Sequence, residues 1–168
     1  MARAGFTAIT SGRISFRKDG LWYSDDEVIP NRAIRRLFSQ TLQILPDGRA
    51  RLELGEDKAD VIIEDTPWVV TAVEGSPALG FTLVLNDETR EALDARTLRV
   101  CDAEVLYARA KAGKYLVRFL RPAYYQLVRH VEAAPDGTIV LPVAGERIPI
   151  PKRAAGGAPA RHGRAGCG

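Results

Sequence analysis

Cysteine and histidine are scarce in this sequence, and their scarcity excludes several kinds of chemistry. The 168 residues include two cysteines, Cys101 and Cys167, and two histidines, His130 and His162. A disulfide framework or a structural zinc site needs clustered ligands, and these residues are not clustered. A nucleophilic serine or cysteine usually needs a histidine base, and only His130 falls in the region expected to fold. Its place off the apolar stripe of its helix indicates a surface histidine.

Phosphate-binding loops and long apolar runs are also missing. Neither GxxxxGK[ST] nor GxGxxG occurs, which disfavours nucleotide binding through these motifs, and no cofactor is expected. Residues Met1–Thr10 lack the apolar run of a signal peptide, and stretches such as Phe81–Leu85 are too short to cross a bilayer. These absences predict a cytoplasmic protein without membrane contact, and the low cysteine count fits a reducing compartment.

The net charge of +3 is small but unevenly distributed. Residues 47–104 contain six basic and fourteen acidic side chains, whereas residues 151–168 contain four basic side chains and no acid. The basic character therefore comes from the C-terminal tail, and the body is close to neutral. A nucleic-acid-binding domain usually carries a strong basic excess on its folded part, so nucleic acid is not expected as a partner.

The first helix is expected at residues 32–45. Apolar residues recur there at three- and four-residue steps from Ile34 to Leu45. Asn31 is suited to cap the helix N-terminus, and Pro46-Asp47-Gly48 would end it. Strands are expected on both sides of this helix, at residues 13–17, 21–24, 49–54, 60–64, 68–73 and 80–85.

The second half of the body predicts another helix that leads into strands. The polar residues Asn86–Asp94 read as a short helix or a loop. Tyr115–Leu120 is apolar and reads as helical, Pro122 would kink or restart the helix, and the helical pattern continues to Val131. Pro135-Asp136-Gly137 would end it. Strands are expected at residues 98–101, 104–110, 138–143 and 147–150.

An internal similarity links the two halves. RLFSQTLQILPDGRARLEL, from Arg36, resembles YQLVRHVEAAPDGTIVLPV, from Tyr125, and both predict a helix, Pro-Asp-Gly and a strand. This pattern indicates either a duplication or the common use of Pro-Asp-Gly as a helix-to-strand turn. Together these features predict an α+β fold with two similar helix–turn–strand units and antiparallel strands.

The two units are placed at residues 12–78 and 79–151. Residues 1–11 are expected to be a flexible N-terminus and residues 152–168 a disordered basic tail. The tail, KRAAGGAPARHGRAGCG, contains no valine, isoleucine, leucine or aromatic residue, so it cannot compensate the entropy lost on ordering.

Four sequence blocks resemble a known family. DGLWY (Asp19–Tyr23), RLFSQTL (Arg36–Leu42), DVIIEDTPW (Asp60–Trp68) and RPAYYQLV (Arg121–Val128) are similar in order and spacing to a proteobacterial family of uncharacterised proteins, domain of unknown function 1285. The resemblance extends over about residues 12–150. It implies an α+β fold with repeated structural motifs and a two-part body. It also implies a suggested role in signal transduction, without an established ligand, reaction or catalytic residue.

The carboxylates Glu64 and Asp65 are the candidates for chemistry. They follow the apolar run Val61-Ile62-Ile63 and precede Thr66-Pro67. Acid–base or Mg²⁺ chemistry would use such a pair, which defines the alternative function, a metal-assisted enzyme. An aspartate at this position can also accept hydrogen bonds from turn amides, and this structural role is favoured.

The arginines are the candidates for binding. Arg32 and Arg36 are four residues apart and point away from the apolar face of the first helix, so they could bind an anion or only keep the helix soluble. Arg121, beside Pro122, is a third candidate, and it is also expected to reach Glu64 or Asp65. The other residues of the family-like blocks are expected to be structural: Trp22, Glu64, Asp65, Pro67, Pro122 and Tyr125.

The sequence therefore favours a binding or regulatory module over an enzyme. Its partner would be a protein or a small anionic ligand, since no catalytic residue, metal ligand or cofactor motif is recognisable.

Overall fold

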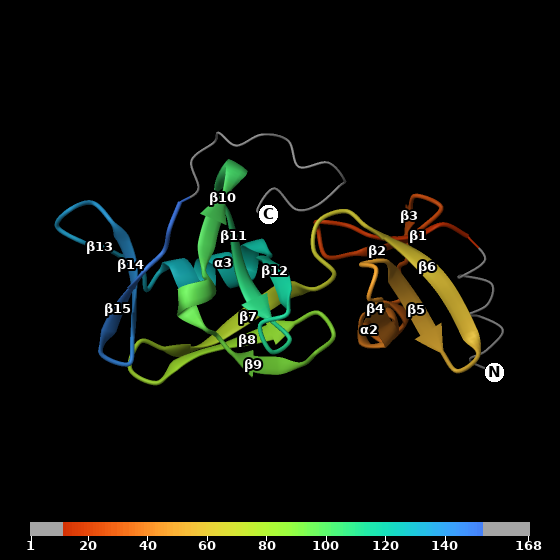
Figure 1. Ribbon diagram of the computed structural model, residues 1–168, viewed down its shortest axis with the longest axis horizontal. Helices are drawn as coiled ribbons and strands as arrows, with labels where there is room; N and C mark the ends of the chain where they lie inside the picture. The colour runs from red at the N-terminus through yellow and green to blue at the C-terminus, as the bar shows by residue number, and fades with distance from the viewer. Residues whose placement is uncertain (1–11, 153–168) are drawn as a thin grey trace.

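The computed structural model describes residues 12–152, which form two lobes side by side (Figure 1). The first lobe contains the elements from β1 to β6, and the second contains those from β7 to β15. Residues 64–68 join them between β6 and β7. The sequence-based boundary of the two units lies further along, between residues 78 and 79, and the division into domains stays a prediction.

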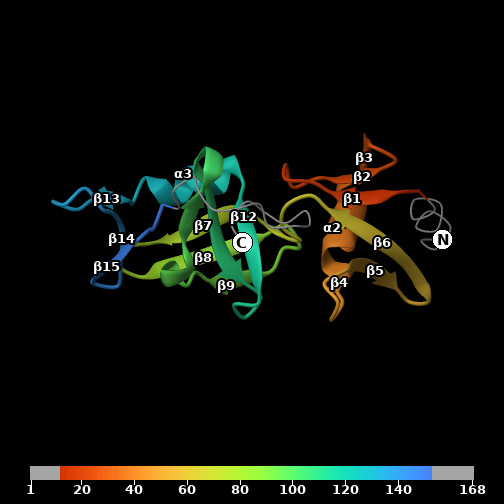
Figure 2. The same cartoon turned by 45° about the horizontal axis from the view of Figure 1, so that its top comes forward.

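The first lobe is a six-stranded sheet around helix α2. Its strands occur in the order β3-β2-β1-β6-β5-β4. Only β1 and β6 pair in parallel. Figure 2 shows β2 and β3 on one side of α2 and β4 and β5 on the other, so the twisted sheet curves around the helix. The elements are β1 (Ile14–Phe16), β2 (Trp22–Ser24), β3 (Glu27–Val28), α2 (Arg32–Thr41), β4 (Leu42–Ile44), β5 (Ala50–Leu54) and β6 (Asp57–Ile63).

The second lobe has a six-stranded and a three-stranded sheet. Their orders are β10-β11-β12-β7-β8-β9 and β13-β14-β15, and β7 and β12 pair in parallel. Helix α3 packs against β7. The elements are β7 (Val69–Ser76), β8 (Gly80–Leu85), β9 (Arg90–Ala92), β10 (Arg99–Cys101), β11 (Val105–Ala110), β12 (Tyr115–Phe119), α3 (Arg121–Val128), β13 (Glu132–Ala133), β14 (Ile139–Val143) and β15 (Glu146–Pro149), with short 3-10 turns at Ala95–Thr97 and Asp102–Glu104.

In each lobe the helix directly precedes a three-stranded antiparallel meander. In both lobes a helix leads into a short strand, a Pro-Asp-Gly turn and an antiparallel meander, β4-β5-β6 or β13-β14-β15. β6 lies parallel to β1, and Lys152, soon after β15, forms a parallel bridge to Val100 of β10. The two sheets are thus similar, and a duplication of the chain stays a prediction.

Helix α2 begins where its cap predicts and ends earlier than expected. The Asn31 side chain accepts hydrogen bonds from the amides of Ala33 at 2.9 Å and Ile34 at 3.2 Å. The helix ends at Thr41, and Leu42 starts β4. Leu42 is buried and satisfies the helical and the strand period alike, so the apolar pattern alone could not place the boundary.

The prediction of a helix at Tyr115–Leu120 is wrong. Tyr115–Phe119 form β12, which pairs with β11 and with β7, and Leu120 is the N-cap residue of α3. A short apolar run such as Tyr115-Leu116-Val117 fits a buried strand and a helix alike, so the apolar pattern alone could not decide between them. Asn86–Asp94 contains a turn and β9. The expectation of antiparallel strands holds for most pairs but fails for β1–β6 and β7–β12, and the described residues are richer in strand than an even α+β mixture.

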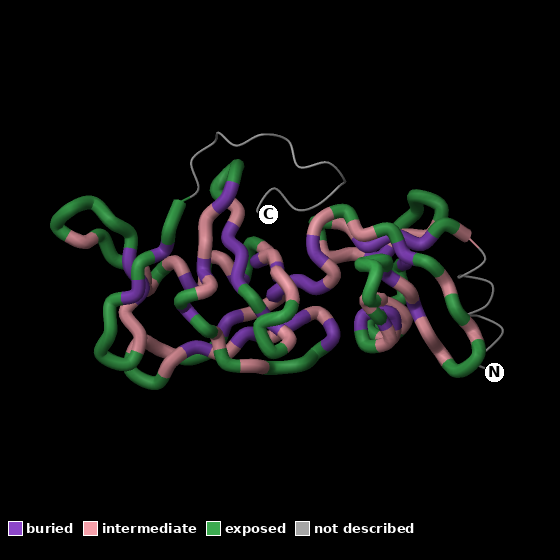
Figure 3. Tube along the Cα trace, viewed as in Figure 1, coloured by how far each residue is buried: buried purple, intermediate pink, exposed green. Residues whose placement is uncertain are grey.

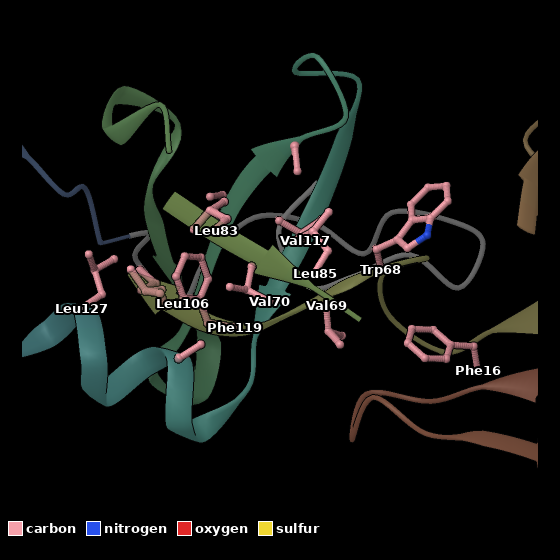
Figure 4. Packing of buried hydrophobic residues seen from close by; sticks show 14 of the residues in the cluster. Phe16, Trp68, Val69, Val70, Leu83, Leu85, Leu106, Val117, Phe119 and Leu127 are labelled. Atoms are coloured by element: carbon pink, nitrogen blue, oxygen red, sulfur yellow. The ribbon is translucent and has the colours of Figure 1, made fainter. Parts of the chain in front are cut away.

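The core is one cluster that extends through both lobes. Phe16, Trp22 and Phe38 form its centre in the first lobe, with ring centroids 5.0 and 5.4 Å apart along that series. Figure 3 shows buried segments running through both lobes and the segment between them. In Figure 4, Phe16 and Trp68 lie where the cores of the two lobes approach each other.

Ser39 joins the two lobes through polar contacts. Its hydroxyl accepts hydrogen bonds from Trp22 Nε1 at 2.9 Å and Asn86 Nδ2 at 2.8 Å, and donates to the carbonyl of Arg35 at 3.1 Å. Trp68 Nε1 donates to the Ser39 carbonyl at 3.0 Å. Since a hydroxyl offers one donor and two acceptor sites, the Ser39 side chain is fully satisfied.

Two further features of the described residues bear on the sequence-based expectations. Cys101 is 3% exposed and disulfide-bonded; Cys167, like most of the tail, lies outside the described residues. No helix in residues 12–152 is long and apolar enough to span a membrane.

The turn after β7 depends on Gly75, and substitution there tests its close approach to Gly80. Gly75 has φ +110°, and a Cβ on it would lie 2.1 Å from the Gly80 carbonyl oxygen. We expect Gly75→Ala to lower the free energy of unfolding by about 2–4 kcal/mol, from backbone strain and steric overlap. Gly113→Ala is the matched control, because Gly113 has φ +75° but open space around it, and its expected cost is about 1 kcal/mol. Equal losses for the two variants in urea unfolding would contradict this interpretation.

Candidate functional site

Glu64 and Asp65 lie in the segment that joins the lobes, and each already has partners. Glu64 is exposed, and one of its carboxylate oxygens accepts a hydrogen bond from the amide of Lys18 at 2.7 Å. That bond ties the β1–β2 turn to the end of β6. The Glu64 carboxylate therefore supports a turn of the first lobe.

Asp65 is the centre of a buried polar cluster in the second lobe. One of its oxygens accepts hydrogen bonds from Tyr107 Oη at 2.9 Å and Arg118 Nη1 at 3.0 Å. The Asp65 and Arg118 side chains are 8% and 22% exposed. Tyr107 and Arg118 are cross-strand partners on β11 and β12. The charge of Asp65 is thus compensated by a neighbour that the sheet holds in place.

The sequence assigned this partnership to Arg121, and that expectation is wrong. Arg121 is the first residue of α3 and is exposed, while Arg118 reaches Asp65 from β12. When Tyr115–Leu120 is interpreted as a helix, the sequence gives no reason to direct Arg118 toward Asp65. As a strand, the same residues place Arg118 between the buried Val117 and Phe119, on the opposite face of β12.

Asp65 accepts its hydrogen bonds from side chains, and Thr66 ties the turn to β12. The hydroxyl of Thr66, which is 3% exposed, donates to the Trp68 carbonyl at 2.7 Å and accepts from the Arg118 amide at 3.3 Å. Pro67 is half-buried between Thr66 and Trp68. The block therefore forms a tight connection between β6 and β7, and its side chains face different partners.

The other residues of the family-like blocks occupy contrasting environments. Trp22 is 1% exposed and bonds to Ser39, as described for the core. Pro122 lies in the first turn of α3, where its missing amide donor costs nothing, so it starts the helix. Tyr125 is 60% exposed and contacts the Tyr124 ring, with centroids 5.4 Å apart.

The candidate arginines of α2 differ in what they contact. Arg36 forms an ion pair with Glu88 of the second lobe at 3.4 Å, with both side chains about half exposed. Arg35 donates to the carbonyls of Ile29 at 2.8 Å and Pro30 at 2.9 Å. Arg32 is exposed and has no ion pair or hydrogen bond from its side chain to any residue in 12–152.

Most other arginines are paired with carboxylates. Those that lack such a partner are available to bind a ligand or another protein. Within residues 12–152, Arg121 resembles Arg32 in lacking any such partner, and the half-buried Arg99 lacks one as well. The Arg109 side chain donates to the Gly113 carbonyl at 3.3 Å and the Arg129 side chain contacts His130 at 3.2 Å, but neither meets a carboxylate. The ion pairs of the remaining arginines include Arg13 and Arg17 with Asp26, Arg49 with Asp47, Arg51 with Glu53, Arg90 with Glu74, Arg96 with Glu146, and Arg147 with Glu132.

Sequence reasoning missed the polar cluster at Lys111. Its ammonium group pairs with Asp87, whose side chain is 5% exposed, and lies 5.0 Å from the centroid of the Trp68 ring. Its amide donates to the Glu91 carboxylate at 2.9 Å. Asp87 lies in the polar stretch Asn86–Asp94, whose sequence fits a short helix or a loop, so no pattern points to Asp87. The cluster holds the β8–β9 turn in place.

The carboxylates of the described residues do not converge on a metal site. No group of three or more histidine, cysteine, aspartate or glutamate side chains in residues 12–152 is placed to hold a metal ion. His130 is half-buried, and its ring lies 5.3 Å from that of Phe81.

Replacing the arginine that pairs with Asp65 should destabilise the protein strongly. Arg118→Met would leave the buried Asp65 carboxylate without its cation, and we expect a loss of about 3 kcal/mol in the free energy of unfolding. Arg121→Met is the matched control, since Arg121 is exposed and unpaired within the described residues, and it should change stability by less than about 0.5 kcal/mol. Urea unfolding of both variants checks this; a larger loss for Arg121→Met would restore the original assignment.

The raised pKa of Tyr107 predicts a loss of stability at alkaline pH. Burial, followed by its hydrogen bond to Asp65, raises the pKa of Tyr107 from 10.0 to about 12. Because the folded state holds this proton more tightly than the unfolded state, stability should fall as pH rises from about 10 to about 12, by on the order of 2 kcal/mol. Urea unfolding across this range should show a smaller fall for Tyr107→Phe than for the wild type. The exposed Tyr125→Phe should leave the fall unchanged, and an equal fall in all three proteins would contradict the prediction.

Comparison with known proteins supports the family resemblance at the level of the fold. No family model and no curated protein matches the chain. A crystal structure of a DUF1285 family protein from Silicibacter pomeroyi matches with a TM-score of 0.63 and 22% identity, covering 82% of this chain and 78% of that one. One from Shewanella baltica matches with a TM-score of 0.55 and 20% identity, covering 70% and 91%. The chain therefore has the fold of DUF1285 (domain of unknown function 1285) family proteins, in agreement with its sequence blocks.

Proposed function

We propose that this protein is a non-enzymatic binding and regulatory module of the cytoplasm that takes part in signal transduction. It would contact a protein partner or a small anionic ligand through exposed arginines. The observation that carries the proposal is the lack of a carboxylate partner at Arg32 and Arg121, in a body where most other arginines are paired.

Electrostatics supports binding through these arginines. An exposed guanidinium without an internal partner keeps its donors available, and it can bridge a carboxylate or phosphate through two parallel hydrogen bonds. Arg32 and Arg121 each begin a helix, α2 and α3. Arg36 is less available, because it pairs with Glu88.

The environment of Glu64 and Asp65 argues against the alternative of a metal-assisted enzyme. Asp65 is enclosed by Tyr107 and Arg118, and Glu64 bonds to the Lys18 amide, so the two carboxylates serve different contacts. A catalytic acid or base needs access to a substrate proton, and Asp65 would have to break a buried ion pair to gain it.

Binding of an acidic probe should depend on salt and on the unpaired arginines. We expect a fluorescein-labelled hexaglutamate peptide to raise its anisotropy with the purified protein at about 50 mM salt and to bind more weakly at about 300 mM, because exposed charges are screened. Arg32→Ala combined with Arg121→Ala should weaken binding without changing the melting temperature. Arg49→Ala, which removes an arginine already paired with Asp47, is the control.

Two results would refute this function. One is that neither hexaglutamate nor pyrophosphate binds at low salt. The other is turnover of a substrate panel that disappears in Asp65→Asn while the fold is retained, which would support the enzyme alternative.

A further inference from the structure

Helices α2 and α3 expose stripes at matching positions. On α2 the stripe is Arg32, Arg36 and Gln40, at 14, 10 and 6 residues before Pro46. On α3 it is Arg121, Tyr125 and Arg129, at the same separations from Pro135. These residues are exposed on both helices, and Phe38 and Leu127, at matching positions on the opposite side, are both 0% exposed. Steps of four residues place each stripe along one helix face.

The stripe of α2 already has a partner within the chain. Arg36 pairs with Glu88 at 3.4 Å, and Gln40 Nε2 donates to the Asp87 carbonyl at 3.2 Å. Beside them, Asn86 Nδ2 donates to Ser39 at 2.8 Å. The α2 face therefore binds an acidic turn, residues 86–89, which connects β8 and β9 in the other lobe.

The matching stripe of α3 has no acidic partner among residues 12–152. Arg121 makes no ion pair or hydrogen bond through its side chain there, and Arg129 contacts only His130. Between them Tyr125 is 60% exposed. The helix sequence, RPAYYQLV, contains no acidic residue that could neutralise the face. Arginine and tyrosine are the residue types that most often dominate binding energy at protein interfaces, together with tryptophan.

We infer that the α3 face, defined as Arg121, Tyr125 and Arg129, docks an acidic turn of a partner protein, as the α2 face docks residues 86–89. The inference rests on the proposed binding function and names its surface and the chemistry of its partner. Arg121 and Arg129 are about 12 Å apart along the helix. The partner turn would therefore present two carboxylates on either side of a group that packs on Tyr125.

A polypeptide fits this face better than a nucleic acid does. Affinity for a nucleic acid grows with the number of phosphates neutralised, and this face offers only two arginines. Two cations neutralise few phosphates of an extended polyanion, whereas a short acidic turn needs only this local positive charge.

A peptide copied from this chain serves as the probe for the α3 face. A cyclised peptide that copies residues 84–91, which include the acidic turn, is titrated into the 15N-labelled full chain. The covalently attached turn occupies α2 at a high effective concentration, so the free peptide should bind α3. We expect amide shifts confined to residues 121–129 and their contacts, and Arg121→Glu with Arg129→Glu should weaken binding about fivefold or more. Arg49→Glu combined with Arg147→Glu is the control, because it makes the same change of net charge at two exposed arginines outside α3.

The outcomes separate this inference from the proposed function. Shifts centred outside α3, or equal binding of a peptide with asparagine and glutamine in place of its acids, would overturn the inference and leave the function standing. Tighter binding of a short DNA duplex or of phosphatidylserine vesicles at α3 would also overturn it. If the double variant unfolds, the inference is still tested by comparing the acidic peptide and its asparagine/glutamine version for binding to the wild-type chain. Failure of hexaglutamate and pyrophosphate to bind anywhere would refute the proposed function itself.

Discussion

The hydrogen bonds around Ser39 hold the two halves of this protein in one arrangement. The serine lies on α2 of the first lobe, and its hydroxyl and carbonyl contact Trp22, Asn86 and Trp68, two of which belong to the second lobe or the segment leading into it. Each of these polar groups is removed from water, so a lost partner would leave an unsatisfied donor or acceptor that costs about 1–3 kcal/mol. The geometry of the seam is therefore specified by polar matching as well as by apolar packing.

The segment between the lobes is stabilised from both sides. Glu64 bonds to the first lobe at Lys18, while Asp65 and Thr66 bond to β11 and β12 of the second. Two adjacent carboxylates thus serve different lobes, which explains why a catalytic pair is suggested by the sequence but not formed by the structure. Buried charges of this kind need a fixed cation, and the parallel pairing of β12 with β7 holds Arg118 beside Asp65.

The two helices show how one architectural position can serve two purposes. The α2 face contributes to the contact between lobes, since its Arg36 and Gln40 meet the β8–β9 turn. The α3 face holds arginines and a tyrosine that no carboxylate within residues 12–152 engages. An exposed basic face costs little stability while it is solvated, and it remains available for a partner of opposite charge.

The sequence by itself determined most of the strands, the cap at Asn31, the Pro-Asp-Gly turns and the place of both helices, because these depend on local period and turn chemistry. It also placed Arg32 and Arg36 on the exposed face of their helix, whereas Arg121 was expected to pair with Glu64 or Asp65 and is exposed instead. Only the tertiary structure decided that Tyr115–Leu120 is a strand, that Arg118 pairs with Asp65, and that Arg36 meets Glu88. Each of these depends on which strand or turn lies opposite, and a short apolar run does not by itself distinguish a strand from a helix. The partners of Ser39 come from positions up to 47 residues away, and such pairings are set by packing of the whole chain.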